Sequence, residues 1–200
     1  KPFLHKCFSK ISFVLYTTPS FVMGLLLILI FSVGLNLFPS SGLMDLSHES
    51  FSFTERILDY AKHLVLPVAV LSSIGIAVFY KYLSENIYSI KKSQFILYLK
   101  SNGYDDSTIL YKHIIPNAIK PLVSIAGIEL GILLGGTLIT EVIFGLPGMG
   151  RLTFSAILQR DYPLVIGCTM IAAVFMIFAN VLADLVKIFI DRRDYQENFA

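Results

Sequence analysis

Charged residues are scarce in this chain of 200 residues. They make up 15% of the sequence, against about 25% in an ordinary soluble domain, while the hydrophobic share is 55% and the mean hydropathy is +0.71. This balance argues against a soluble globular protein. There are two cysteines, Cys7 and Cys168, and they lie so far apart in the sequence that we expect small buried or interfacial residues rather than a disulfide framework.

The sequence also lacks the patterns that carry enzymatic chemistry. No G-x-x-x-x-G-K-[ST] occurs, so a nucleotide-binding P-loop is not expected. The run FGLPGMG at residues 144–150 has closely spaced glycines, but it is not set between a strand and a helix as a dinucleotide-binding loop would be. The four histidines are scattered, match no metal-ligand spacing and form no catalytic pattern with serine or cysteine. We therefore predict no catalytic, metal or cofactor site in this chain.

The apolar residues are gathered in four long blocks, residues 11–38, 64–83, 121–144 and 163–190. A helix needs about 20 apolar residues to cross the hydrocarbon core, and a backbone inside the bilayer must satisfy its own hydrogen bonds. The first block begins too late and runs too long for a cleavable signal peptide. The alternating pattern of a membrane barrel is absent. The sequence predicts an all-α polytopic transmembrane bundle with four visible spans, forming a single domain.

The basic residues are distributed unevenly around these blocks. If the blocks cross the membrane alternately, twelve of the sixteen Lys and Arg fall on one side, and only Arg56, Lys62, Arg151 and Arg160 on the other. The positive-inside rule makes the richer side cytoplasmic, which places both visible ends and a loop over residues 82–120 in the cytoplasm. Nucleic acid is not an expected partner, because the basic residues lie beside the spans rather than on one soluble face.

Local signals refine the spans. Pro19 falls about two turns into the first block and predicts a bend, because proline frees a backbone carbonyl. Residues 43–62 mix aromatic and aliphatic residues with acids, which predicts an amphipathic helix on the membrane surface, capped by Ser52 or Thr54. Pro67 falls in the first turn of the second span, where proline is tolerated.

The long cytoplasmic loop has the composition of helices. Apolar residues at helical spacing predict a helix over residues 82–101, which Asn102 and Gly103 end in a left-handed cap. Residues 105–107, Asp-Asp-Ser, offer N-cap chemistry for a second short helix over residues 106–114, which we expect to stop at Pro116. The loop is therefore predicted to be a hairpin of two helices.

Three acidic residues lie within the predicted spans. A carboxylate in hydrocarbon is costly, so each is a candidate for the transport pathway. Asp184 has an alternative role as the ion-pair partner of Lys187, one turn away, and Glu141 is shallow enough to reach interfacial water. Glu129 lies deepest, either as a pathway residue or as a protonated carboxyl bonded to another helix.

A stripe of small residues follows one face of the third span. Gly127, Gly131 and Gly135 are spaced by four, so they stack along the helix and let another helix approach closely. The neighbouring helix belongs either to the same subunit or to a second one.

The loop and the sequence after it resemble the permeases of binding-protein-dependent ABC importers, the oligopeptide/dipeptide/nickel family. Those proteins carry a cytoplasmic loop in which a proline follows a glycine by thirteen residues, as Pro116 follows Gly103 here. An E-x-x-F-x-x-P-G-x-G-R-L element begins at Glu141, and R-D-Y-P begins at Arg160. Upstream, TTPSFVMGLLLILIFS and LVLPVAVLS resemble two of the family's spans, while residues 97–99 read Leu-Tyr-Leu where the family's loop has acid-Ala-Ala.

The resemblance implies a permease subunit in a bacterial inner membrane that moves peptides, nickel or a metal chelate. The implied partners are a second permease subunit, homologous or identical, two ATPase subunits that hold ATP and Mg, a periplasmic or lipid-anchored solute-binding protein, and membrane lipids. It further implies a family of about six spans, the first two of which precede this chain. From the residues alone, an ion-coupled secondary transporter using Glu129 or Asp184 remains an alternative.

The resemblance assigns candidate residues to two tasks. Contact with the ATPase subunits is expected at Gly103, Tyr104, Asp105, Asp106, Ile109, Leu110 and Pro116. Pathway or gate residues are expected at Glu129, Glu141, Pro147, Gly148, Gly150 and Asp184. A short cytoplasmic helix with Tyr104, Ile109 and Leu110 exposed would need a groove to cover its apolar side chains, which agrees with docking on a partner.

Overall fold

A computed structural model describes residue 10 and residues 12–190. The predicted cytoplasmic ends, with Cys7 and the two C-terminal arginines, lie outside the described residues. The described part contains helices, turns and bends but no strand, which confirms the all-α prediction. In chain order the labelled elements are α2 (Ser20–Leu27), the π-helix η1 (Ile28–Gly34), the 3-10 turn η2 (His48–Ser50), α3 (Phe53–Lys91), α4 (Gln94–Ser101), α5 (Asp106–Thr108), the π-helix η3 (Ile109–Ile114), α6 (Ile115–Gly135), α7 (Leu138–Ile143), α8 (Met149–Gln159) and α9 (Tyr162–Ile190).

Three helical stretches in the described residues are long and apolar enough to cross a membrane: Phe53–Lys91, Asp106–Ile143 and Tyr162–Ile190. They correspond to the second, third and fourth predicted spans. The first predicted span, residues 11–38, is instead divided at Pro19, whose extended backbone (ψ 139°) separates a helical stretch at residues 12–17 from α2. Pro19 lacks an N–H and disfavours helical geometry at Thr18, so the expected bend becomes a complete break.

The helix α3 is longer than predicted at both ends. The expected boundary between a surface helix ending near residue 62 and a second span is wrong, because α3 runs unbroken for 39 residues from Phe53 to Lys91. No turn residue interrupts it before Pro67, and the helix continues through that proline. The predicted cap at Ser52 is confirmed, since the Glu55 carboxylate accepts hydrogen bonds from the Ser52 N–H (2.8 Å) and hydroxyl (2.7 Å).

Three further boundaries differ from the predictions. The helix expected over residues 82–101 is divided, because α3 ends at Lys91 and α4 begins at Gln94. The expected stop at Pro116 is wrong, because η3 runs directly into α6 and this proline lies inside one continuous helical stretch. Conversely, the predicted third span ends early at Gly136, whose φ of +107° stops α6 before α7 begins. The eleven-residue helix α8 was not predicted.

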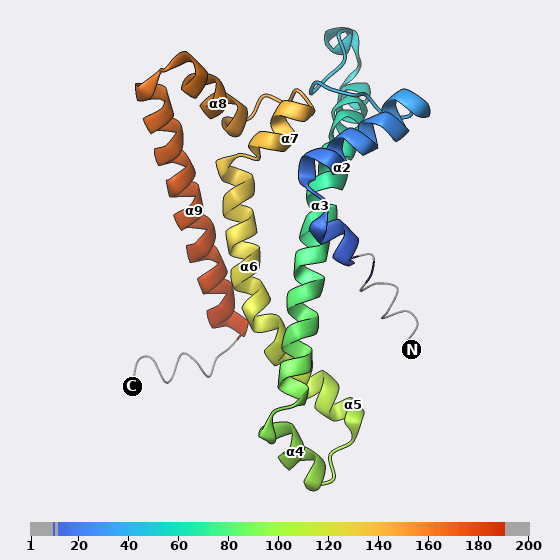
Figure 1. Cartoon of the computed structure of the whole chain (residues 1–200), viewed down its shortest axis with the longest axis vertical. Helices are drawn as coiled ribbons and strands as arrows, with labels where there is room; N and C mark the ends of the chain where they lie inside the picture. The colour runs from blue at the N-terminus through green and yellow to red at the C-terminus, as the bar shows by residue number, and fades with distance from the viewer. Residues whose placement is uncertain (1–9, 11, 191–200) are drawn as a thin grey trace.

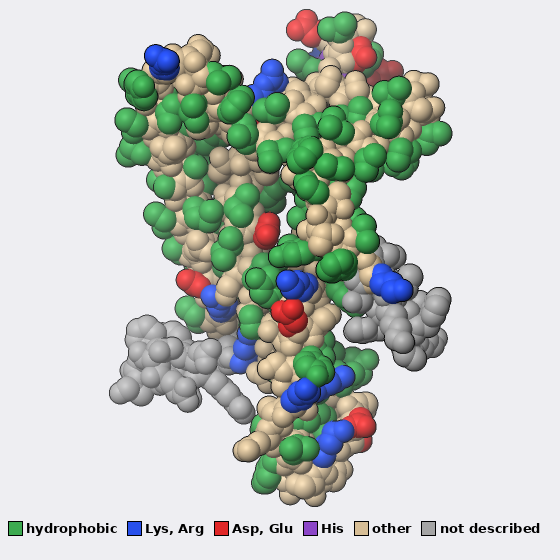
Figure 2. Space-filling view, in the orientation of Figure 1, with side chains coloured by type: hydrophobic (Ala, Val, Ile, Leu, Met, Phe, Trp, Pro, Cys, Tyr) green, Lys and Arg blue, Asp and Glu red, His purple; other side chains and the backbone are tan. Residues whose placement is uncertain are grey.

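The helices form an open bundle rather than a closed one (Figure 1). The long helices α6 and α9 lie side by side, and α3 packs along α6 from the other side. One end carries α4 and α5, and the opposite end carries α2, α7, α8 and the segment before α3. Hydrophobic side chains cover much of the visible surface of the long helices, while most of the visible Lys and Arg lie toward the α4–α5 end (Figure 2). We call these the hairpin end and the elbow end.

Candidate functional site

The helical hairpin, residues 94–114, is built around a small apolar core of its own. Ile96 and Leu99 of α4 pack against Ile109 and Ile114 of η3, and all four are buried. The expectation that Ile109 is exposed is therefore wrong: its side chain is 1% exposed. Burial of these side chains makes the hairpin a rigid unit rather than a flexible loop.

The turn of the hairpin depends on backbone geometry. Gly103 has φ +81°, which confirms the predicted left-handed conformation. A Cβ at Gly103 would meet nothing within 4 Å, so the constraint is the backbone angle and not crowding. Beside this turn, Tyr104 is half exposed and available to a partner.

Asp105 caps the second arm of the hairpin. Its carboxylate accepts hydrogen bonds from the Ser107 hydroxyl and from the Thr108 N–H (3.0 Å). These bonds, first of all that from Ser107, hold the pKa of Asp105 well below its usual range. Asp106 forms an exposed ion pair with Lys100 across the turn (2.8 Å), so the two arms are also joined by charge.

The elbow, residues 136–151, is organised by the carboxylate of Glu141. This side chain is 7% exposed, and its two oxygens accept hydrogen bonds from the backbone N–H groups of Thr137 (2.7 Å) and Arg151 (2.8 Å). Glu141 thus joins the end of α6 to the start of α8. The contacts support a structural role at this position rather than exposure to interfacial water.

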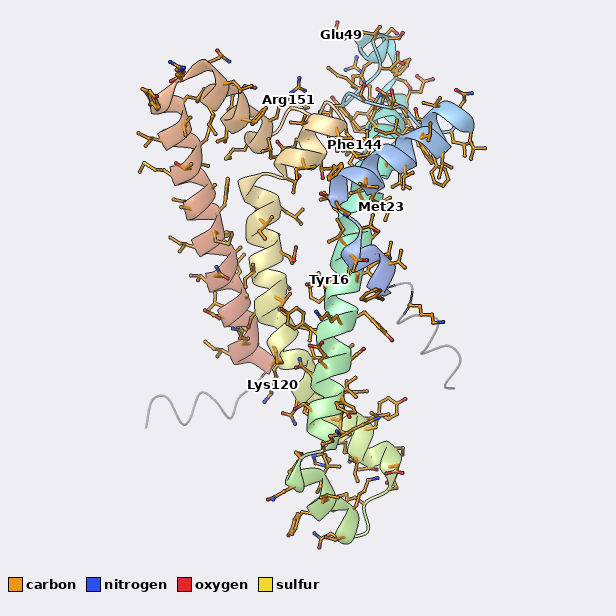
Figure 3. All side chains as sticks on the ribbon, in the orientation of Figure 1. Tyr16, Met23, Glu49, Lys120, Phe144 and Arg151 are labelled. Carbon is orange, nitrogen blue, oxygen red and sulfur yellow. The ribbon has the colours of Figure 1, made fainter. Side chains whose placement is uncertain are left out.

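The glycines of the elbow are required by close approach, to this carboxylate or to the backbone around it. A Cβ on Gly148 would overlap the carboxylate of Glu141, and one on Gly150 would lie 2.7 Å from the Leu138 backbone. Gly136 packs against the Gly150 N–H with equally little room. Pro147 and Gly148 also line a cavity of about 700 Å³, together with Arg151, which points toward the space between α8 and α7 (Figure 3).

Phe144 anchors the elbow in the main core of this end. Its side chain is 2% exposed and packs with Leu66 and Val70 of α3 and with Met23 of α2 (Figure 3). Its carbonyl accepts a hydrogen bond from the N–H of Gly42 (2.8 Å). The elbow is therefore attached to α2, to α3 and to the segment that joins them.

With this geometry in place, comparison with known proteins is informative. Residues 1–193 match the family described as binding-protein-dependent transport system inner membrane component. The chain belongs to this family.

Similar members are named as peptide permeases. The chain is 34% identical over 182 residues to the oligopeptide transport system permease protein AppB of Bacillus subtilis, covering 91% of this chain and 56% of that protein. It is 31% identical over 187 residues to the dipeptide transport system permease protein DppB of Escherichia coli K12, covering 86% and 55%. The di/tripeptide transport system permease protein DppB of Pseudomonas aeruginosa is 30% identical over 184 residues, covering 86% and 55%. The chain thus spans about half the length of the curated relatives it matches.

In this permease-family chain, the glycine stripe of α6 faces α9. A Cβ on Gly127 would overlap that of Ala183, and one on Gly131 would lie 3.1 Å from the Met176 Cα. A Cβ on Gly135 would lie 3.4 Å from the Cβ of Ala172. The structure thus uses all three glycines for packing within the chain.

The remaining acids of the permease spans have different surroundings. Asp184 forms the predicted ion pair with Lys187 (2.7 Å), and its side chain is 67% exposed. Glu129 is half-buried on α6, and no hydrogen bond or ion pair to it is found among the described residues. The structure does not bring Glu129, Glu141 and Asp184 together.

Sequence reasoning missed one group of interacting residues near the elbow. His48, Asp59 and His63 are buried and joined through the Asp59 carboxylate. The spacing of Asp59 and His63 by four on one helix was a usable signal. The contribution of His48 depends on the fold of the preceding segment, which the sequence pattern does not specify.

Proposed function

We propose that this chain forms the pathway-lining part of a permease subunit in an ABC importer of peptides. The observation that carries the proposal is the family match over residues 1–193, combined with a rigid hairpin at the end of the molecule where basic residues gather. Peptides are favoured as cargo because similar relatives are named as oligopeptide, dipeptide and di/tripeptide permeases. Nickel or a metal chelate is less favoured, since none of these relatives is named for a metal.

The proposed complex contains a second permease subunit, two ATPase subunits with ATP and Mg, and a solute-binding protein. By the positive-inside rule, we expect the hairpin end on the cytoplasmic side of the membrane and the elbow end on its outer side. On this orientation the hairpin meets the ATPases, and the elbow meets the side from which the binding protein delivers solute. ATP hydrolysis takes place in the partner subunits.

The hairpin is suited to receive force. Its own apolar core keeps its two arms together, while Tyr104 and Asp106 remain exposed for contact with a partner groove. Its second arm, η3, continues through Pro116 directly into α6, so a displacement of the hairpin moves a membrane-spanning helix. Gly103 forms the turn of this unit, Asp105 caps its second arm, Ile109 is buried in its core and Leu110 packs against that core.

The elbow is the proposed gate at the opposite end. It begins at the Gly136 break, where α6 stops, and Glu141, Gly148 and Gly150 hold its turns together. Pro147 lines its cavity. Within the spans, we propose Glu129 as a pathway residue, since it is half-buried at mid-helix. The ion pair and exposure of Asp184 favour a position at the membrane surface instead.

Replacement of Gly103 tests the coupling. The full-length natural subunit would be reconstituted with its partner subunits in vesicles, and ATP-dependent uptake of a labelled peptide measured with ATP hydrolysis. Gly103→Val should reduce uptake at least tenfold and remove the stimulation of ATP hydrolysis by the loaded binding protein, because a β-branched residue disfavours φ +81°.

Gly75→Val is the matched control, because a Cβ at Gly75 in α3 meets nothing within 4 Å. It should transport like the wild type. Normal uptake and normal stimulation in Gly103→Val would contradict the role of the hairpin, and peptide uptake driven by a pH gradient without ATP would contradict the ABC assignment altogether.

A further inference from the structure

A segment that the transport proposal does not use lies across the elbow end. Residues 39–51, which we call the strap, join η1 to α3 at this end of the molecule (Figure 1). On one side the strap touches the elbow: the Gly42 N–H donates to the Phe144 carbonyl (2.8 Å), and a Cβ on Gly145 would lie 3.5 Å from the Cβ of Ser41. On the other side the strap is tied to α3.

The tie to α3 is the buried carboxylate of Asp59. Its Oδ2 accepts hydrogen bonds from the backbone N–H of Asp45 (2.9 Å) and from Nδ1 of His48 (2.7 Å), both in the strap. Its Oδ1 lies 3.1 Å from Nδ1 of His63, one turn further along α3, and the same Nδ1 lies 2.9 Å from the backbone carbonyl of Asp59. The side chains of Asp59, His48 and His63 are each no more than 8% exposed.

These bonds decide where the strap lies. A buried carboxylate is tolerated only when hydrogen-bond donors satisfy it, so the strap and Asp59 hold each other in place. The His48 ring also packs on Tyr60 of α3, with 4.5 Å between ring centroids. The neighbouring charged side chains bind other groups than Asp59: Arg56 of α3 donates to the carbonyls of Glu49 and Phe51 at the end of the strap, and Glu55 caps Ser52.

Resting on the proposed function, we propose that Asp59 is a positioning residue for transport that holds the strap between α3 and the elbow at the outer gate. Asp59 lies two helical turns before Leu66, which packs on Phe144 of the elbow. The strap and this core thus join the same two elements on adjacent levels. Without Asp59, the strap loses the hydrogen bonds from Asp45 and His48 to α3 and keeps those from Arg56 at its end, so its contact with the elbow loosens.

A cysteine pair reports the position of the strap directly. Ser41→Cys with Gly145→Cys places two Cβ atoms about 3.5 Å apart, within disulfide range, in a background with Cys7→Ser and Cys168→Ala. Gly135→Cys with Ala172→Cys, 3.4 Å apart between α6 and α9, is the matched control pair. Disulfide formation is followed in membrane vesicles containing the full-length subunit, so neither solute nor ATP is needed.

Asp59→Asn should slow disulfide formation in the strap pair about tenfold and leave the control pair unchanged. His48→Phe, which keeps an aromatic ring near Tyr60 but removes the Nδ1–H, should have the same effect. It provides the second test if Asp59→Asn does not fold. The exposed strap residue Glu49 supplies the control, and Glu49→Gln should change neither pair.

In each variant the rate of the strap pair is divided by the rate of the control pair. Comparing this ratio between variants cancels the reactivity of the thiols and the strain of a side chain at Gly145, because every variant shares both. This ratio should fall in Asp59→Asn and in His48→Phe and should keep its wild-type value in Glu49→Gln. Equal ratios in all variants would overturn the proposal. So would a loosened strap in Asp59→Asn with an unchanged maximal rate of peptide uptake. A complex that moves no peptide would refute the proposed function while leaving the disulfide result readable.

Discussion

A single carboxylate accounts for most of the elbow's unusual composition. Glu141 needs backbone donors close by, and Gly148 and Gly150 let the chain approach it where any side chain would collide. Proline at 147 and glycine at 148 end one turn and begin α8 immediately afterwards. The run from Glu141 to Arg151 is therefore one structural unit, in which each special residue serves the same hydrogen-bonded turn.

Replacing this carboxylate by an amide should loosen the unit. In Glu141→Gln the amide NH₂ faces one of the two N–H donors, leaving a buried group unsatisfied at a cost of about 2 kcal/mol. We expect amide hydrogen exchange at Thr137 and Arg151 to become about thirtyfold faster. Glu49→Gln, an exposed acid at the same end, should leave both rates unchanged, and equal protection in Glu141→Gln would show that the carboxylate does not hold the elbow.

Asp105 makes the hairpin sensitive to acid. Because the pKa of Asp105 is lowered in the folded hairpin, its contribution to stability is present above the ordinary aspartate pKa and is lost as the pH falls toward the folded value. The protection factor of the Thr108 amide, the exchange rate of an unfolded chain at the same pH divided by its own rate, should therefore fall below about pH 4 in the wild type. In Asp105→Ala this protection factor should already be low at pH 7 and should lack the acid-dependent step.

Residue roles that depend on near neighbours could be predicted from sequence. The Asp184–Lys187 pair, the left-handed Gly103 and the Ser52 cap all involve residues within four positions of each other or a single backbone angle. The burial of Ile109 and the bond between Asp59 and His48 could not, because both depend on packing between segments.

At the scale of elements, prolines were the main source of error. Pro116 and Pro67 were expected to mark helix starts or stops, yet both lie inside continuous helical stretches. A proline ends a helix only where the backbone groups it frees find no other partner. Pro19 did break its helix: its backbone is extended (ψ 139°), and α2 begins only at Ser20.

The packing of α6 on α9 should be intolerant of larger side chains. Gly131→Leu would drive its Cβ into Met176, where the ideal position already lies 3.1 Å from a backbone atom. Overpacking of this kind costs about 1–3 kcal/mol, so we expect a lower melting temperature in lipid nanodiscs. Gly167→Leu, in open space on α9, should melt like the wild type.

At the scale of the whole molecule, the hydrophobic blocks predicted the fold class and three of the spans correctly. Long apolar blocks are a strong signal because the bilayer leaves the backbone so few choices. The elbow was not predicted, since residues 136–151 are short, rich in glycine and fixed by contacts with α2 and α3. Periodicity identifies the long helices but not the turns between them.

The 39-residue helix α3 is longer than the membrane is thick. At about 1.5 Å per residue the helix extends roughly 58 Å, nearly twice the hydrocarbon core of about 30 Å. One end reaches the hairpin and the other carries Asp59. When α3 tilts as one unit about a point inside the membrane, its two ends move in opposite directions. A small tilt that moves the hairpin one way therefore moves the strap the other way. The thickness of the membrane sets how far each end of α3 extends beyond it, so a thicker bilayer should reduce the displacement at both ends.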